Sequence, residues 1–180
     1  MGLKAAAFFW GLAEATLFFI VPDVLLSAVA LRDRAWALRL CLWTLGGALI
    51  GGLVMYQWGR HDVEQASQVL TRVPAIGDTM LIRVATDLER LGSLATFLGP
   101  LTGTPYKLYA ALSPEAGISL AAFLLISIPA RLIRFALIAV IISSITNKWL
   151  RHWSYRQRLS LILTLWAAFY LVYFLLMPWN

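Results

Sequence analysis

Residues 5–31 read AAAFFWGLAEATLFFIVPDVLLSAVAL, an apolar stretch that is interrupted at two places. The first interruption is Glu14, and the second is the pair Pro22-Asp23. Neither half alone provides the roughly 20 apolar residues that a helix needs to cross a bilayer. Proline also disfavours helical geometry at the residue before it. We therefore expect a broken or re-entrant helical hairpin that dips into a membrane and returns.

The composition of the whole chain favours a membrane protein. Of the 180 residues, 61% are hydrophobic, and they form long runs such as 118–128 that do not alternate with polar residues. A soluble domain is typically about 45–50% apolar, and the strands of a β-barrel would alternate. Because the hydrocarbon layer holds no water, the backbone must satisfy its own hydrogen bonds, which favours helices. The sequence indicates an all-α integral membrane protein.

The two segments after the first hairpin differ in polarity. Residues 35–58 are apolar and long enough to span a bilayer. Their Gly47 and Gly51 form a GxxxG pattern, which lets another helix approach closely, and Tyr56 is placed to lie at the membrane interface. Residues 60–91 are polar, with apolar residues at helical spacing on both sides of a break that contains proline and glycine. This pattern predicts two amphipathic helices on the membrane surface.

The second half of the chain repeats the order of the first. Residues 93–112 are apolar but broken, and the segment Ser113-Pro114-Glu115 predicts the start of a helix that spans the membrane over 116–145. A basic loop at 147–158 and a last span at 160–179 complete a single membrane domain. The breaks in the second hairpin are Gly99-Pro100, Gly103, Pro105 and Lys107.

The order of these segments suggests an inverted repeat. The units 5–58 and 93–145 each consist of a hairpin followed by a span. Because an odd number of crossings separates the two hairpins, they would enter from opposite faces, as in many transporters. The predicted fold therefore has two opposed re-entrant or broken hairpins and three transmembrane helices.

Lysine and arginine indicate the orientation. Residues 32–39 and 147–158 are rich in these side chains and fall on one face in this topology. Cytoplasmic loops carry an excess of Lys and Arg, so we predict that both segments are cytoplasmic. The basic residues lie beside apolar runs, so the net charge of +6 indicates contact with anionic lipid and not with nucleic acid.

Five charged residues fall within the apolar segments, and we take them as candidate substrate-binding or proton-binding residues. A charge at the centre of a bilayer costs about 2.5–3.5 kcal/mol on insertion scales, so such residues normally face a wet cavity or pair with each other. Glu14 is either a functional acid or part of a structural ion pair. Asp23 is either a functional acid or a helix N-cap. The five are Glu14, Asp23, Lys107, Arg131 and Arg134.

The basic members of this set suit a phosphate. Arg131 and Arg134 are three residues apart and share one helix face, and paired guanidinium groups bind phosphate well. The alternative is that they only neutralise the acids Glu14 and Asp23. Lys107 either joins them or extends to the interface. Two acids and three bases would leave a shared cavity weakly positive, which favours an anionic headgroup.

The sequence lacks the motifs that would indicate an enzyme. It contains no HExxH, no GxSxG and no Gly-rich phosphate loop. His61 and His152 lie far from the buried acids in sequence, and the single Cys41 excludes a cysteine metal cluster. We expect no catalysis, no metal and no cofactor, and we interpret Cys41 and the glycines of the first span as packing residues.

Three motifs occur in a defined order along residues 5–145. Glu14 precedes Pro22-Asp23, the glycine-rich span ends in Tyr56-x-x-Gly-Arg, and a second hairpin over 98–111 contains prolines and glycine. Together they resemble the DedA family, also called SNARE-associated or VTT-domain proteins, and the short length is similar to its YqaA-like branch.

This resemblance implies opposed re-entrant hairpins around a hydrophilic cavity in a bacterial plasma (inner) membrane. It also implies movement of undecaprenyl phosphate or a phospholipid between leaflets, or proton-coupled transport. The family's essential acids would correspond to Glu14 and Asp23. The family often has two arginines around its second proline motif, where this chain offers Lys107, with Arg131 and Arg134 further on.

Our leading hypothesis is a flippase or scramblase of an anionic, phosphate-bearing lipid, with membrane lipids as partners. The alternatives are a proton-coupled transporter of a small solute and a membrane-homeostasis or assembly factor without transport. The sequence leaves proton coupling and homo-oligomer formation open.

Overall fold

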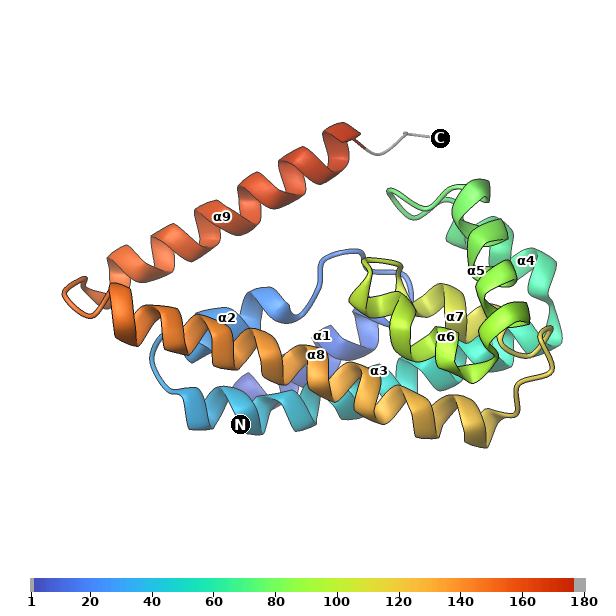
Figure 1. The fold of residues 1–180 in the computed structure, drawn as a ribbon, viewed down its shortest axis with the longest axis horizontal. Coiled ribbons are helices and arrows are strands. Elements are labelled where there is room, and N and C mark those ends of the chain that lie inside the picture. Colours follow the sequence, from blue (N-terminus) through green and yellow to red (C-terminus); the bar gives the residue numbers. More distant parts are fainter. Residues whose placement is uncertain (1, 177–180) are drawn as a thin grey trace.

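The computed structural model describes residues 2–176, and all of their regular elements are helical. Three helices are long and apolar enough to cross a membrane: α3 (Arg34–His61), α8 (Leu120–Trp149) and α9 (Tyr155–Leu176). The prediction of an all-α protein with three potential membrane spans is confirmed. Helix α3 lies at the centre of the bundle, where it contacts α1, α7 and α8 (Figure 1).

The first apolar stretch forms two helices, α1 (Gly2–Glu14) and α2 (Asp23–Ala30), joined by a non-helical tip at residues 15–22. Helix α1 runs along α3 in the same direction. Its Lys4 lies over the Trp43 ring at 5.5 Å, whereas Ala15, just beyond its end, reaches Gly51. The short helix α2 then returns to the beginning of α3 (Figure 1).

The glycines of α3 permit this close approach. A Cβ atom at Gly47 would collide with the carbonyl oxygen of Phe8, and one at Gly51 would lie 2.7 Å from the carbonyl oxygen of Leu12. A larger residue at either position would push the backbones of α1 and α3 apart. The packing that the GxxxG pattern predicts is therefore present.

The polar middle of the chain forms the helices α4 (Val63–Leu70) and α5 (Asp78–Leu91). The carboxylate of Asp62 accepts a hydrogen bond from the Gln65 amide at 2.8 Å and so caps the start of α4. Each helix buries one apolar face: Ala66 and Leu70 on α4, Val84 and Leu88 on α5. Both helices contact α7.

The second broken stretch forms α6 (Ser93–Leu98), a 3-10 turn η1 (Gly99–Leu101) and α7 (Tyr106–Leu112). Helix α7 also runs along α3 in the same direction, because Tyr106 lies against Gly52 and Ala111 lies against Gly59. Helix α1 therefore covers the first half of α3 and α7 covers the second half. The tips of the two helix pairs meet near the middle of α3.

The predicted start of the second span is wrong. Ser113 ends α7, with its hydroxyl donating to the carbonyl oxygen of Tyr109 at 2.6 Å, and α8 begins only at Leu120. The N-cap is Ser119, whose hydroxyl accepts a hydrogen bond from an amide in the first turn. The physical reason is Gly117, whose φ of +71° is incompatible with a continuing right-handed helix.

The predicted basic loop at 147–158 is mostly helix, so its boundaries also need correction. Helix α8 continues through Trp149, and α9 starts at Tyr155, so that only residues 150–154 connect them. Lysine and arginine have good helix propensity and do not stop α8. Ser154 and Gln157 form a reciprocal capping box at the start of α9. The Ser154 amide donates to Oε1 of Gln157 at 2.9 Å, and the Gln157 amide donates to Oγ of Ser154 at 3.4 Å.

Tyr56, for which the sequence suggested a place at the membrane interface, is packed inside the protein. Its side chain is buried in a cluster with Phe123, at 5.6 Å between ring centroids. Its hydroxyl donates to the carbonyl oxygen of Ile118 at 2.7 Å. The tyrosine thus ties α3 to the turn that precedes α8.

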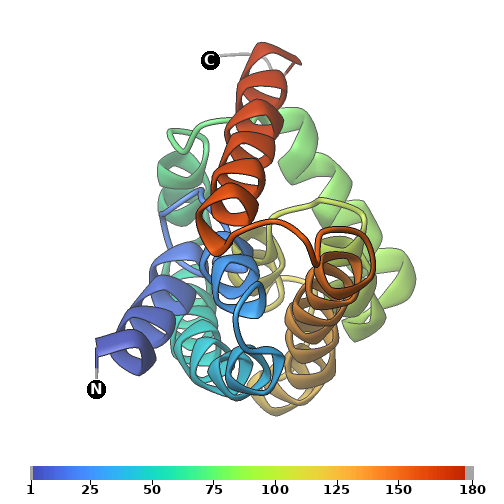
Figure 2. The same ribbon diagram turned by 90° about the vertical axis from the view of Figure 1, so that its left-hand side faces the viewer.

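The two basic segments lie at the same end of the molecule, where α3 begins and α8 ends (Figure 1). Helix α9 leaves this end and diverges from the other helices, above α2 (Figure 2). It is mostly exposed and touches the bundle mainly with one face.

Candidate functional site

Two ion pairs, one buried and one partly buried, join α8 to the first helix pair. Arg131 pairs with Glu14, the last residue of α1, and the more distant of its two hydrogen bonds to the carboxylate is 3.5 Å long. Arg134 donates from Nη2 to Oδ2 of Asp23, the first residue of α2, at 2.8 Å. The structure thus brings together four of the five charged residues that the sequence singled out, with one arginine for each acid.

Asp23 does not cap a helix, so the N-cap alternative is wrong. The N-cap position of α2 is Pro22, and no side chain accepts a capping hydrogen bond there. The Asp23 carboxylate instead points to Arg134, because a buried acid is strongly destabilising without an opposite charge beside it. Its second oxygen, Oδ1, is buried and has no hydrogen-bond partner among the described residues.

Arg131 is held from both sides. Its guanidinium carbon lies 4.9 Å from the centroid of the Tyr106 ring and 4.7 Å from that of Phe135, which is a favourable cation–π geometry. The Tyr106 hydroxyl donates to Oγ of Ser127 at 3.0 Å, which fixes the ring. Arg131 is fully buried, and this environment makes it a fixed counter-charge for Glu14.

Tyr106 is a contributor to this arrangement that sequence reasoning missed. It lies where Gly52 leaves room, since a Cβ atom at Gly52 would collide with the tyrosine hydroxyl. The glycine-rich face of α3 could have indicated it, because glycines on a helix face leave room for a large side chain from another helix.

Lys107 does not extend to an interface. Its side chain is buried, and Nζ donates to the carbonyl oxygen of Phe18 at 2.6 Å. Phe18 belongs to the tip at residues 15–22, so this bond connects the second helix pair to the first. The side chain is therefore turned into the protein and does not extend along its outer surface.

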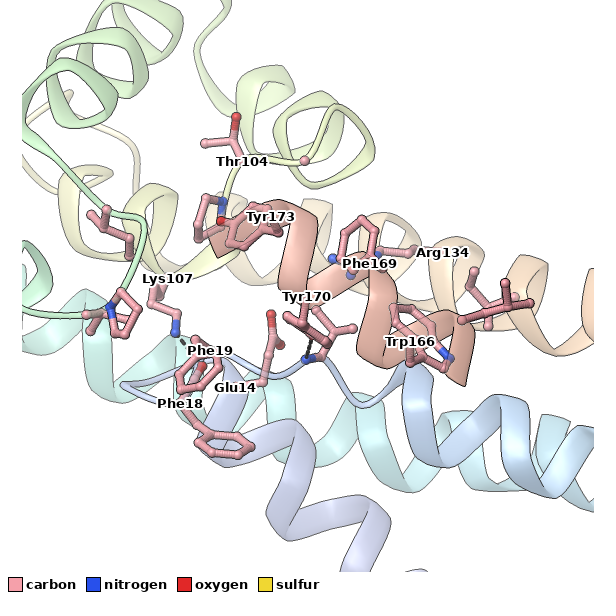
Figure 3. Close-up of a pocket in the computed structure, with 18 of the residues that line it drawn as sticks. Glu14, Phe18, Phe19, Thr104, Lys107, Arg134, Trp166, Phe169, Tyr170 and Tyr173 are labelled. Carbon is pink, nitrogen blue, oxygen red and sulfur yellow. Dashed lines mark hydrogen bonds between the residues drawn. The ribbon is translucent and has the colours of Figure 1, made fainter. Parts of the chain in front are cut away.

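A cavity of about 380 Å³ lies between the two tips, the middle of α8, the loop between α4 and α5, and α9 (Figure 3). Its charged lining residues are Glu14, Lys107 and Arg134, and Gly103 and Pro105 contribute the second tip. Arg131 and Asp23 do not line it. The cavity wall therefore carries one acid and two bases, within a mostly apolar surface.

One face of α9 supplies an aromatic wall to this cavity, which the sequence analysis also missed. Trp166, Phe169, Tyr170 and Tyr173 follow helical spacing and all line the cavity (Figure 3). The Tyr170 hydroxyl accepts a hydrogen bond from the backbone amide of a tip residue, Val21, at 2.8 Å. The spacing of the aromatic residues in the last span was the signal that could have indicated this wall.

The side chains of the described residues include no group of three or more His, Cys, Asp or Glu that could hold a metal ion. The site instead offers a cationic surface, one carboxylate and an aromatic wall. Such a surface can bind an anion that has an apolar part.

Comparison with known proteins gives little further information. No protein-family model matches the chain, and no solved structure matches it. The chain is similar to an uncharacterised protein of Haemophilus influenzae, with 23% identity over 137 residues that cover 74% of this chain and 70% of that protein.

Proposed function

We propose that this chain is a membrane transport protein that moves an anionic, phosphate-bearing lipid between leaflets, as a flippase or scramblase. The observation that supports this proposal is the composition of the cavity wall. Lys107 and Arg134 lie on a wall that is otherwise largely apolar and aromatic. Lysine and arginine bind phosphate oxygens through charge-assisted hydrogen bonds. The apolar remainder suits the tail of a lipid.

In this proposal the pairs α1–α2 and α6–α7 are re-entrant hairpins that enter from opposite faces. The packing on α3 supports this arrangement, because α1 and α7 cover opposite halves of that helix and their tips meet beside Gly51 and Gly52. Irregular backbone is tolerated at membrane depth where it lines a cavity. Binding sites of many transporters lie near the midplane between such inverted units.

In our proposal the two arginines have different roles. Arg131 is enclosed by aromatic rings and paired with Glu14, so in our proposal it positions that acid and does not touch the lipid. Arg134 is partly exposed toward the cavity, and together with Lys107 it would hold the phosphate. Glu14 pairs with Arg131 and also lines the cavity. In our proposal its carboxylate would therefore meet a proton or the cationic part of a lipid headgroup.

The position of α9 favours a lipid over a small solute as the cargo. This helix forms one wall of the cavity, yet it is mostly exposed and touches the bundle mainly with one face. A wall of that kind opens sideways to the bilayer more easily than a helix packed on all sides. The resemblance to the DedA family, a bacterial plasma membrane and a cytoplasmic basic end are parts of the same proposal.

The test uses purified variants in liposomes that contain a fluorescent phosphatidic acid, with dithionite quenching of the outer leaflet. Lys107→Met and Arg134→Met should each slow translocation about tenfold or more, because each removes a hydrogen bond to a charged group. Lys148→Met, at the far end of α8, is the matched control and should translocate at the wild-type rate.

Three further results would decide between the hypotheses. Unchanged translocation by both cavity variants would refute the lipid proposal. Transport of a water-soluble phosphate compound without lipid translocation would favour the solute transporter. Full activity of Glu14→Gln in a folded protein would argue that this acid has a structural role alone.

A further inference from the structure

The tip of the first hairpin, residues 15–22, is held by side chains from outside the loop. Buried backbone groups that are not in a helix need another hydrogen-bond partner, above all where water is excluded. Three partly buried, non-helical backbone groups of this tip are paired with side chains of α1, α7 and α9. The bonds are Trp10 Nε1 to Ile20 O at 2.9 Å, Lys107 Nζ to Phe18 O at 2.6 Å, and Val21 N to Tyr170 Oη at 2.8 Å.

Two of these three side chains belong to the cavity wall. Lys107 and Tyr170 both line the cavity, and both reach the tip from elements far from it in sequence (Figure 3). Trp10 lies on the same helix pair as the tip and would move with it. The position of the tip relative to the rest of the protein therefore depends on two groups that a bound ligand would also meet.

We propose that Lys107 and Tyr170 form a latch that keeps the tip of the first hairpin closed, and that an anionic phosphate group opens it. A phosphate in the cavity takes the Lys107 ammonium away from the carbonyl oxygen of Phe18. Of the two bonds that tie the tip to elements outside its own helix pair, only the one to Tyr170 on α9 then remains. In this scheme Tyr170 is a positioning residue, whereas Lys107 also binds the phosphate, and the scheme rests on the proposed function for its ligand.

The exchange at Lys107 is physically favourable. An ammonium makes a charge-assisted hydrogen bond with either acceptor, but with a phosphate the attraction between two opposite charges is added. Lys107 is buried, and the hydrogen bond of its ammonium to the Phe18 carbonyl breaks when a phosphate draws Nζ further into the cavity. Once the carbonyl of Phe18 loses its donor, the closed tip is left with an unsatisfied polar group and becomes less stable.

The bond to Tyr170 connects this event to α9. The Phe19 ring of the tip packs edge-on against the Tyr170 ring, with 6.4 Å between their centroids. Since α9 is mostly exposed, movement of the tip loosens the helix that separates the cavity from the surrounding lipid. The latch thus couples the arrival of a phosphate to opening of the lateral wall.

Hydrogen–deuterium exchange of the full chain in maltoside micelles tests the latch, because exchange rates of amides report local opening. Tyr170→Phe should raise the exchange rate of the Val21 amide about fivefold, the effect expected for loss of one hydrogen bond of about 1 kcal/mol. Lys107→Met should raise the exchange of the tip amides about tenfold. Tyr173→Phe is the control, since this hydroxyl makes no hydrogen bond to the described residues.

Ligand additions then separate the latch from the proposed function. Dioctanoyl phosphatidic acid should speed exchange of the tip in the wild type but add nothing in Lys107→Met, and dioctanoylglycerol should have no effect. An equal response to inorganic phosphate would support the latch and identify a soluble phosphate as the ligand. If both variants exchange like the wild type, the latch is refuted, whatever the liposome assay shows.

The remaining combinations are also decisive. Tip loosening by phosphatidic acid without any lipid translocation would support the latch and refute the proposed transport. Translocation that depends on Lys107, with a tip that never responds to phosphatidic acid, would support transport and overturn the displacement step. Tyr170→Phe removes one oxygen atom, so it tests the latch even if Lys107→Met fails to fold.

Discussion

Replacement of Arg131 by methionine should destabilise the protein strongly. The guanidinium is fully buried and pairs with Glu14, so its removal leaves a buried carboxylate without a counter-charge. Breaking a buried ion pair from one side costs about 3–5 kcal/mol of the free energy of unfolding. Loss of the contacts with Tyr106 and Phe135 adds to that value, by about 1 kcal/mol for cation–π geometry.

The double variant separates the charge from the packing. Glu14→Gln keeps hydrogen-bonding atoms while it removes the charge, so the combination with Arg131→Met contains no unpaired buried ion. Its total loss should fall short of the sum of the single losses by about 2–3 kcal/mol, within the range found for directly coupled residues. Arg134→Met is the comparison: the side chain of Arg134 is 21% exposed, and its removal should cost less than that of Arg131.

Equilibrium unfolding in mixed micelles of maltoside and dodecyl sulfate measures these differences, with the fluorescence of the tryptophan residues as the signal. Far-UV circular dichroism of each variant before unfolding shows that helices have formed. Additive losses in the double variant would mean that Glu14 and Arg131 do not interact energetically, and the reasoning on the buried pair would be refuted.

Two further predictions test the packing and the topology. Gly47→Ala should lower the free energy of unfolding by about 1–3 kcal/mol, because the added Cβ meets the backbone of α1. Gly46→Ala is the control and should be tolerated, because its Cβ would have no atom closer than 3.8 Å. Equal losses of stability in thermal unfolding would contradict the close approach of α1 and α3. In a Cys41→Ala background, single cysteines that replace Arg34 and His61 probe the two ends of α3. They should react with an impermeant maleimide from opposite sides of the membrane. Labelling of both from the same side would refute the inverted arrangement.

The charged residues that the sequence grouped together lie in two different environments. Arg131 and Asp23 are enclosed by protein, whereas Lys107 and Arg134 face the cavity. A loss of activity on substitution of an enclosed residue would therefore report on the position of its partner. The two liposome variants of the cavity wall are the informative ones for the cargo.

The sequence by itself determined the helical class, the three long apolar helices and the breaks in the two hairpins. These features are local: hydrophobic runs of sufficient length, and proline or glycine within them, specify where a helix forms and where it stops. It also identified the five charges within the apolar segments, because a charge within an apolar run is conspicuous without any knowledge of its neighbours. It failed where two local signals competed, as at Ser113 and Ser119, which are both plausible N-caps.

Only the tertiary structure decided which groups meet. Glu14 and Arg131 are 117 positions apart, and Tyr170 contacts a residue 149 positions away, so no local pattern fixes these pairs. Helical periodicity gives the face on which a side chain lies but not the helix that the face will contact. The assignment of Arg131 to Glu14, of Lys107 to the first tip and of the aromatic face of α9 to the cavity therefore follows from how the helices pack, since packing is a property of the whole chain.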